Sequence, residues 1–169
     1  MKKTLKVCAA IAIVAGLSNT VNAQTVTTTV GAKIVEAITL TETSPMHFGT
    51  MTVPSTAATV ILATDGTRTN TGTVTLLAQA PVATAAGYTV TGSNDATYAI
   101  TLPGSIFIGN GVPANNMVVD NFTCTYPTLV SSLGIAGTDF FFLGATLNLA
   151  SGQATGTYSG TFDVSVAYN

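Results

Sequence analysis

The chain has 169 residues; 47% are hydrophobic and only 7% are charged, with five Lys or Arg and seven Asp or Glu. Three of the cations lie in the first six residues, so the rest of the chain carries only Lys33 and Arg68 against all seven acids. Nucleic-acid binding is nearly excluded, because two cations cannot form the basic face that neutralises phosphates. High hydrophobicity with so little charge first suggests a membrane protein, and the N-terminus accounts for much of that impression.

The first 23 residues have the three parts of a secretory signal peptide. Lysines in residues 1–6 precede an uncharged apolar run, Val7–Leu17, and small residues end the segment at Ala23. We therefore expect cleavage after Ala23 and export of the chain. The apolar run is about half of the roughly 20 residues that a membrane-spanning helix needs, so no integral membrane span is expected. Cleavage also removes Cys8, which leaves Cys124 without a partner for an internal disulfide.

Apolar residues recur with period 2 along the remaining chain, which is typical of strands. Val26–Leu40 alternates over its whole length and predicts one long strand or two consecutive ones. Met46–Thr52 predicts a short strand, whereas Ala78–Ala86 could be a helical turn or a loop, with Pro81 opposing a helix. Further strands are predicted at Ala58–Ala63, Thr73–Leu77, Gly87–Thr91, Tyr98–Leu102, Met117–Tyr126, Phe140–Leu149 and Tyr158–Tyr168.

Short strands separated by Gly, Asn, Asp and Pro turns, without a convincing helix, predict an all-β antiparallel sandwich. Frequent threonine together with valine and isoleucine supports extended structure, because β-branched side chains suit a pleated surface. No fixed repeat and no change in composition marks a second domain. We predict an extended N-terminal arm at residues 24–32 and one β-sandwich domain at residues 33–169.

The sequence offers little for catalysis or metal binding. Cys124 alternates with Phe122 and Tyr126 on one apolar face, so it is interpreted as a small buried hydrophobe. His47 is the only histidine and has no second His or exported Cys with which to complete a zinc site. Four acids in or beside turns are expected to bond nearby main-chain amides, with a calcium site built from two turns as the alternative: Asp65, Asp95, Asp120 and Asp139. We predict no enzyme activity, no catalytic residue, no cofactor and no metal.

The C-terminal segment has the clearest two-sided pattern in the chain. Its polar residues alternate with residues that form an apolar face, and the chain stops one residue after the last residue of that face. A sandwich strand that ends a chain raises the question of what covers its free edge, because exposed edges pair with other chains. The alternating set is Gly156, Tyr158, Gly160, Phe162, Val164, Val166 and Tyr168.

These residues carry a resemblance to a known group. Subunits of chaperone–usher pili end in an alternating strand with a penultimate Tyr and a Gly fourteenth from the end, and here Tyr168 and Gly156 hold those positions. Together with Met46–Thr50, Tyr98–Pro103 and Gly144–Leu147, they make the chain similar to secreted bacterial domains of uncharacterised function that resemble spore-coat-U and archaic pilin subunits.

The resemblance implies an incomplete immunoglobulin-like sandwich that a donor strand completes. A periplasmic chaperone would supply that strand first, and the N-terminal arm of the next subunit would replace it, so an outer-membrane usher and a cell-surface fibre of identical subunits are also implied. Main-chain hydrogen bonds would give affinity and alternate side chains would give register. The implied donor residues are Val26, Thr28, Val30 and Ala32, and the implied acceptor residues are Gly156, Tyr158, Phe162, Val164, Val166 and Tyr168.

Two alternatives remain open at the level of sequence. Val26–Leu40 can be the domain's own first strand, in which case the sandwich is complete and no polymer follows. The protein would then be a monomeric secreted or surface-attached binding domain, for instance an adhesin that uses the loops at Asn110–Gly111 and Asn115–Asn116. A hydrolase would depend on His47 and Cys124 alone.

Overall fold

The structure, a computed structural model, describes residues 23–169. The predicted signal peptide, apart from Ala23, lies outside the described residues. The chain divides after Lys33 into an N-terminal part and a compact unit, Ile34–Asn169. Residues 23–38 form no strand, and all but the last of them are exposed. The strand predicted at Val26–Leu40 is therefore wrong for most of its length, because alternation marks an extended chain but does not supply a strand to pair with it.

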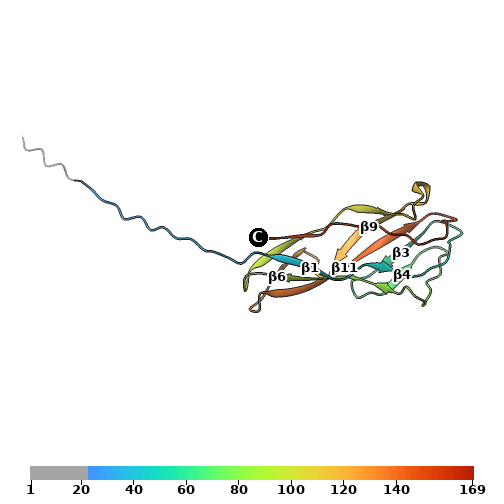
Figure 1. Cartoon of the computed structure of the whole chain (residues 1–169), viewed down its shortest axis with the longest axis horizontal. Helices are drawn as coiled ribbons and strands as arrows, with labels where there is room; N and C mark the ends of the chain where they lie inside the picture. Colours follow the sequence, from blue (N-terminus) through green and yellow to red (C-terminus); the bar gives the residue numbers. More distant parts are fainter. Residues whose placement is uncertain (1–22) are drawn as a thin grey trace, which may run out of the picture. The chain divides into compact units, whose positions relative to one another are not determined.

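The compact unit is built around one antiparallel sheet, in which β11 is the longest strand (Figure 1). The first half of β11 pairs with β6, and its second half pairs with β3 and β9 on its two edges. Then β1 extends the sheet beyond β6, β4 beyond β3, and β8 beyond β9. The strands are β1 (Thr39–Ser44), β3 (Ala58–Leu62), β4 (Arg68–Asn70), β6 (Ala86–Thr91), β8 (Ser105–Ile108), β9 (Met117–Cys124) and β11 (Thr138–Leu149).

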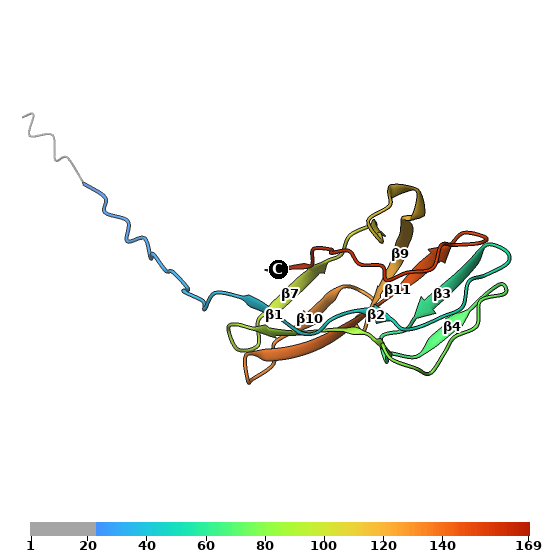
Figure 2. The same cartoon turned by 45° about the vertical axis from the view of Figure 1, so that its right-hand side comes forward.

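Two smaller sheets accompany the large one. Strands β10 (Val130–Ser132), β7 (Thr97–Thr101) and β12 (Ser165–Tyr168) form a three-stranded sheet, and β2 (His47–Phe48) pairs with β5 (Ala83–Thr84). Figure 2 shows the C-terminal chain, in red, running lengthwise across the unit before it ends at the three-stranded sheet. The predicted all-β antiparallel sandwich is confirmed. Among residues 23–169, no helix is long and apolar enough to cross a membrane.

The buried side chains form two hydrophobic clusters, one at each end of β11. The first contains Val60, Leu62, Met117, Val119 and Leu147, and we call it the groove cluster because it underlies the site described below. The second is centred on Phe141, whose ring stacks on Tyr88 with centroids 5.2 Å apart, and contains the fully buried Tyr98, Val90 and Leu143. Alternation along β11 explains both, since every second residue of that strand faces the interior.

A carboxylate at the start of β11 ties the second cluster to its surroundings. Asp139 accepts hydrogen bonds from the hydroxyls of Tyr98 at 3.0 Å, Tyr126 at 2.8 Å and Ser131 at 2.6 Å, and from the N–H of Phe140 at 2.8 Å. Burial opposes ionisation, but these hydrogen bonds outweigh it and hold the pKa of Asp139 below its ordinary value. The sequence placed Asp139 beside a turn; instead it joins β11 to three side chains of the second cluster and its rim.

Several predicted elements differ from those observed. Thr73–Leu77 forms no ladder and has only an isolated bridge between Leu76 and Met51. The predicted strand Tyr158–Tyr168 is a strand only from Ser165 onward, because the residues before it lack a continuous neighbour. Ala78–Ala86 is no helix; it contains a cis peptide before Pro81 and then β5. Strands β4, β8 and β10 were missed because they are only three or four residues long.

Candidate functional site

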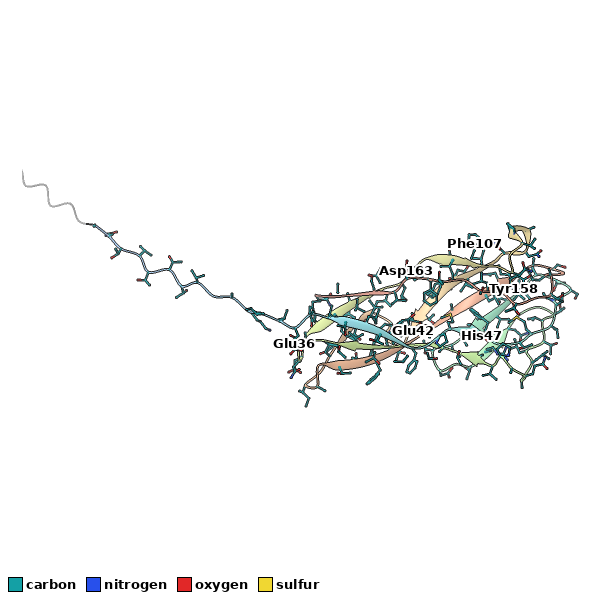
Figure 3. The ribbon with its side chains drawn as sticks, in the orientation of Figure 1. Glu36, Glu42, His47, Phe107, Tyr158 and Asp163 are labelled. Carbon is teal, nitrogen blue, oxygen red and sulfur yellow. The ribbon has the colours of Figure 1, made fainter. Side chains whose placement is uncertain are left out.

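An apolar groove of about 670 Å³ lies beside the groove cluster. One wall is residues 46–54, which we call the β2 wall; the other is residues 153–162, the C-terminal wall. Figure 3 shows His47 and Tyr158, one from each wall, toward the same end of the compact unit. The floor of the groove comes from β8, β9 and β11: Ile106, Ile108, Met117, Val119, Leu147 and Leu149.

The two walls are joined at their ends and separated between them. At one end, the N–H of Gly152 donates to the carbonyl of Pro54 at 2.9 Å. At the other, well beyond the groove, the hydroxyl of Tyr168 donates to the carbonyl of Glu36 at 2.9 Å. Among the described residues, no hydrogen bond connects 37–53 with 153–167. Two antiparallel segments therefore border an apolar groove, and no described strand lies in the gap between them.

Each wall is paired on the side away from the gap. The β2 wall pairs with β5 through His47 and Phe48, and the N–H of Leu77 donates to the carbonyl of Thr50 at 3.0 Å. The C-terminal wall exchanges two main-chain hydrogen bonds between Ser159 and Gly109, at 2.9 and 3.0 Å. A strand that entered the gap would find a main-chain edge on each side of it.

Arg68 fixes the position of the β2 wall. Its guanidinium donates to the carbonyls of Phe48 at 2.8 Å and Thr50 at 3.1 Å, and to that of Leu77 at 2.9 Å. The guanidinium occupies the space that a Cβ at position 49 would fill, and Gly49 has a φ of 74°, so two requirements favour glycine there. One of the two cations that follow residue 6 is thus committed to holding one side of the groove.

We expect Arg68→Met to lower the free energy of unfolding by about 2 kcal/mol, because three carbonyls lose a charged donor. Urea unfolding followed by circular dichroism measures the effect. Lys33→Met is the matched control: it removes the other cation that follows residue 6, an exposed residue just after the arm. It should change stability by less than about 0.5 kcal/mol. Equal stability of the two variants would contradict the role assigned to Arg68.

Two polar side chains at the groove form hydrogen bonds within the chain. Nδ1 of His47 accepts the N–H of Gly49 at 2.7 Å. The hydroxyl of Tyr158 accepts from the amide of Gln153 at 3.0 Å and donates to the carbonyl of Ala154 at 2.7 Å. None of the side chains of residues 23–169 that line the groove is Asp, Glu, Lys or Arg. What the groove offers to a partner is apolar surface and main-chain hydrogen bonding, with no acid–base pair.

The predicted acceptor residues lie along the C-terminal wall and its continuation. Gly156, Tyr158 and Phe162 line the groove, whereas Val164, Val166 and Tyr168 pack against the second cluster. Sequence reasoning missed the floor and the opposite wall, although the apolar alternation of Met46 and Phe48 and of Ile106 and Ile108 was a usable signal. The predicted donor residues lie in the exposed arm, where Val26 is 87% and Val30 is 95% exposed.

The cysteine, the histidine and the acids that the sequence offered for catalysis or metal binding lie at separate places in the fold. Cys124 is half-buried in β9 against the second cluster, and burial raises the pKa of its thiol. His47 instead lines the groove, so His47 and Cys124, the two residues on which a hydrolase would depend, belong to different parts of the unit. Oδ1 of Asp65 accepts the N–H of Thr67 at 2.8 Å, which confirms its predicted turn role. Within residues 23–169, no three His, Cys, Asp or Glu side chains form a cluster that could hold a metal ion.

The loop proposed for an adhesin is also held internally. Oδ1 of Asn110 accepts the N–H of Val112 at 3.1 Å, and the amide of Gln153 donates to the carbonyl of Asn115 at 2.7 Å. A short 3₁₀ turn, Pro113–Asn115, completes the loop. These contacts stabilise the loop itself and do not single out a ligand.

The fold and the groove define an all-β sandwich domain with an open apolar groove. A family model described as "Domain of unknown function (DUF4402)" matches residues 38–168, so the chain belongs to that family. The match begins one residue before β1 and covers the compact unit to its last strand. Comparison with curated proteins and with solved structures gave no match.

Proposed function

We propose that the protein is a structural subunit of an extracellular bacterial fibre that polymerises by donor-strand complementation. The observation that carries the proposal is the gap between the β2 wall and the C-terminal wall. An ordinary sandwich fills such a gap with its own strand, because open edges and exposed core promote aggregation. Here the described chain leaves the gap open, and a segment of another subunit would complete an immunoglobulin-like fold.

The N-terminal arm has the composition that the gap requires. Residues 24–32 carry no charge, and the groove lining carries none either. On one side of the arm, Val26, Val30 and Ala32 would enter the groove with Thr28 between them. Residues 24–34 extend over about 36 Å as a strand, at roughly 3.3 Å per residue. Burial of the two valines alone would contribute about 3–6 kcal/mol.

The positions of the arm base and the groove favour a chain of subunits. The arm joins the compact unit near Glu36, whereas His47 and Tyr158 of the groove lie toward the opposite end (Figure 3). A contact from one end of a subunit to the other end of its neighbour does not close on itself, so repetition generates a filament. The same gap would bind a periplasmic chaperone before assembly, with an usher at the outer membrane as the further expected partner.

We expect the protein purified after export to form a heat-sensitive ladder on a gel and filaments by negative-stain electron microscopy. The ladder reflects subunits held by strand pairing, which resists detergent until it is heated. A single monomer peak by light scattering at every concentration, with a cooperative melt, would contradict the fibre and favour a monomeric binding domain.

A further inference from the structure

Three residues far apart in sequence meet where the arm joins the compact unit. The N–H of Glu36 donates to Oγ of Ser93 at 2.8 Å, and the carbonyl of Glu36 accepts the hydroxyl of Tyr168 at 2.9 Å. The same Tyr168 oxygen accepts the N–H of Ser93 at 2.8 Å. Both main-chain groups of Glu36 are therefore bound, and we call these three residues the arm clamp.

The clamp connects the large sheet with the three-stranded sheet. Ser93 follows β6 of the large sheet, and Tyr168 ends β12 of the three-stranded sheet. A Cβ on Gly92 would collide with the Tyr168 hydroxyl, so the close approach of that hydroxyl requires glycine. The segment that follows β6 is itself held, because the N–H of Gly92 donates to the carbonyl of Gly137 at 2.9 Å. Tyr168 thus reaches Glu36 from a fixed position.

Glu36 is the first residue of the compact unit that has a hydrogen-bonded partner in the described chain. Within the compact unit, Ile34 and Val35 before it have no hydrogen-bonded partner. Residues 32–38 contain no Gly, Pro, Asn or Asp, and include the β-branched Ile34 and Val35. Such a stretch is poorly suited to a tight reversal. An arm that entered its own gap would have to reverse close to Glu36, where both main-chain groups are held.

We propose that the arm clamp disfavours insertion of the arm into the gap of its own subunit and so reserves the arm for a second copy of the chain. This inference rests on the proposed function and adds its regulation. Tyr168 acts as a positioning residue, because it holds Glu36 and does not itself donate the strand. Loss of its hydroxyl frees the carbonyl of Glu36 to turn, and the equilibrium moves toward the self-inserted monomer.

The experiment compares wild type, Tyr168→Phe and Ser93→Ala after unfolding of the exported protein and refolding at low concentration. Monomers are isolated by gel filtration and treated with trypsin, for which Lys33 is a site on the arm. A free arm is cut at Lys33, whereas a self-inserted arm is protected. We expect the protected fraction of monomer to rise about five-fold in Tyr168→Phe and in Ser93→Ala, the shift that loss of one hydrogen bond gives.

Tyr126→Phe is the matched control, since it removes a phenol hydroxyl bound to Asp139 and leaves the arm base intact. It should leave cleavage at Lys33 at the wild-type rate. If Tyr168→Phe and Ser93→Ala monomers are cut like the control while wild type still polymerises, the clamp has no positioning role and the inference is overturned. If wild type forms no polymer at any concentration, the proposed function itself fails.

Discussion

A protein that lacks Gln24–Val30 is expected to remain monomeric at concentrations where the full arm gives filaments. The deletion removes Val26 and Val30, whose burial in a neighbour's groove would contribute about 3–6 kcal/mol. A loss of that size weakens association by more than about a hundred-fold. Light scattering after gel filtration measures the mass of the species, and microscopy shows whether filaments are present. Continued polymerisation of the truncated protein would exclude the arm as the donor.

The truncated monomer also allows a direct test of the groove. A synthetic peptide of residues 24–34 should bind it and raise its melting temperature, because a ligand that binds only the folded state stabilises it by about 2.7 kcal/mol at a hundred times its Kd. The matched control peptide exchanges Val26 with Thr27 and Val30 with Thr29, which keeps the composition and moves the valines to the other face. Equal stabilisation by the two peptides would contradict insertion in register.

The second large effect is expected at Asp139. Replacement by Ala leaves the hydroxyls of Tyr98, Tyr126 and Ser131 without their shared acceptor, and Tyr98 is fully buried. Hydrogen bonds to a charged group contribute about 1.5–3 kcal/mol each, and an unpartnered buried hydroxyl costs more than an exposed one. We expect the free energy of unfolding to fall by about 3 kcal/mol in urea titrations at pH 7. Asp163→Ala, at an exposed carboxylate, is the control and should have little effect.

The effect at Asp139 should depend on pH in a defined direction. Its pKa is lower in the folded protein than the ordinary value of 3.8, so the folded state favours the ionised form. This contribution is fully present above the unfolded-state pKa and is lost as pH falls through the folded-state value. The difference in stability between wild type and Asp139→Asn should therefore shrink as the pH is lowered below about 4. A difference that grows on acidification would contradict the assignment.

Period-2 alternation was sufficient to predict the class of fold and most of the long strands. Thr138–Leu149, Met117–Cys124 and Ala86–Thr91 appear within a few residues of their expected bounds. The same signal failed at Thr73–Leu77, because alternation reports an extended chain with two unlike faces and says nothing about the neighbour that completes a ladder. It failed equally at residues 158–164, which are extended but lie beside the open gap.

The sequence predicted one wall of the candidate site. The C-terminal alternation identified Tyr158 and Phe162, and these side chains do line the groove. The opposite wall, the floor and the role of Arg68 were not predicted, since they depend on segments separated by up to about a hundred residues meeting in space. Asp139 shows the same limit. Its place beside a turn could be predicted, but its three hydroxyl partners come from β7, from β10 and from the segment between β9 and β10.

By itself, the sequence determined that the chain is a threonine-rich β protein with an uncharged segment at residues 24–32 and only two cations after residue 6, because these properties reside in residue types and their spacing. Only the tertiary structure decided that an apolar groove lies between the walls 46–54 and 153–162. It also decided that Gly152 bonds to Pro54 at one end of the walls, and that Tyr168 bonds to Glu36 beyond their other end. Strand pairing is a long-range interaction, so which edge stays open is settled only when all other partners have been placed.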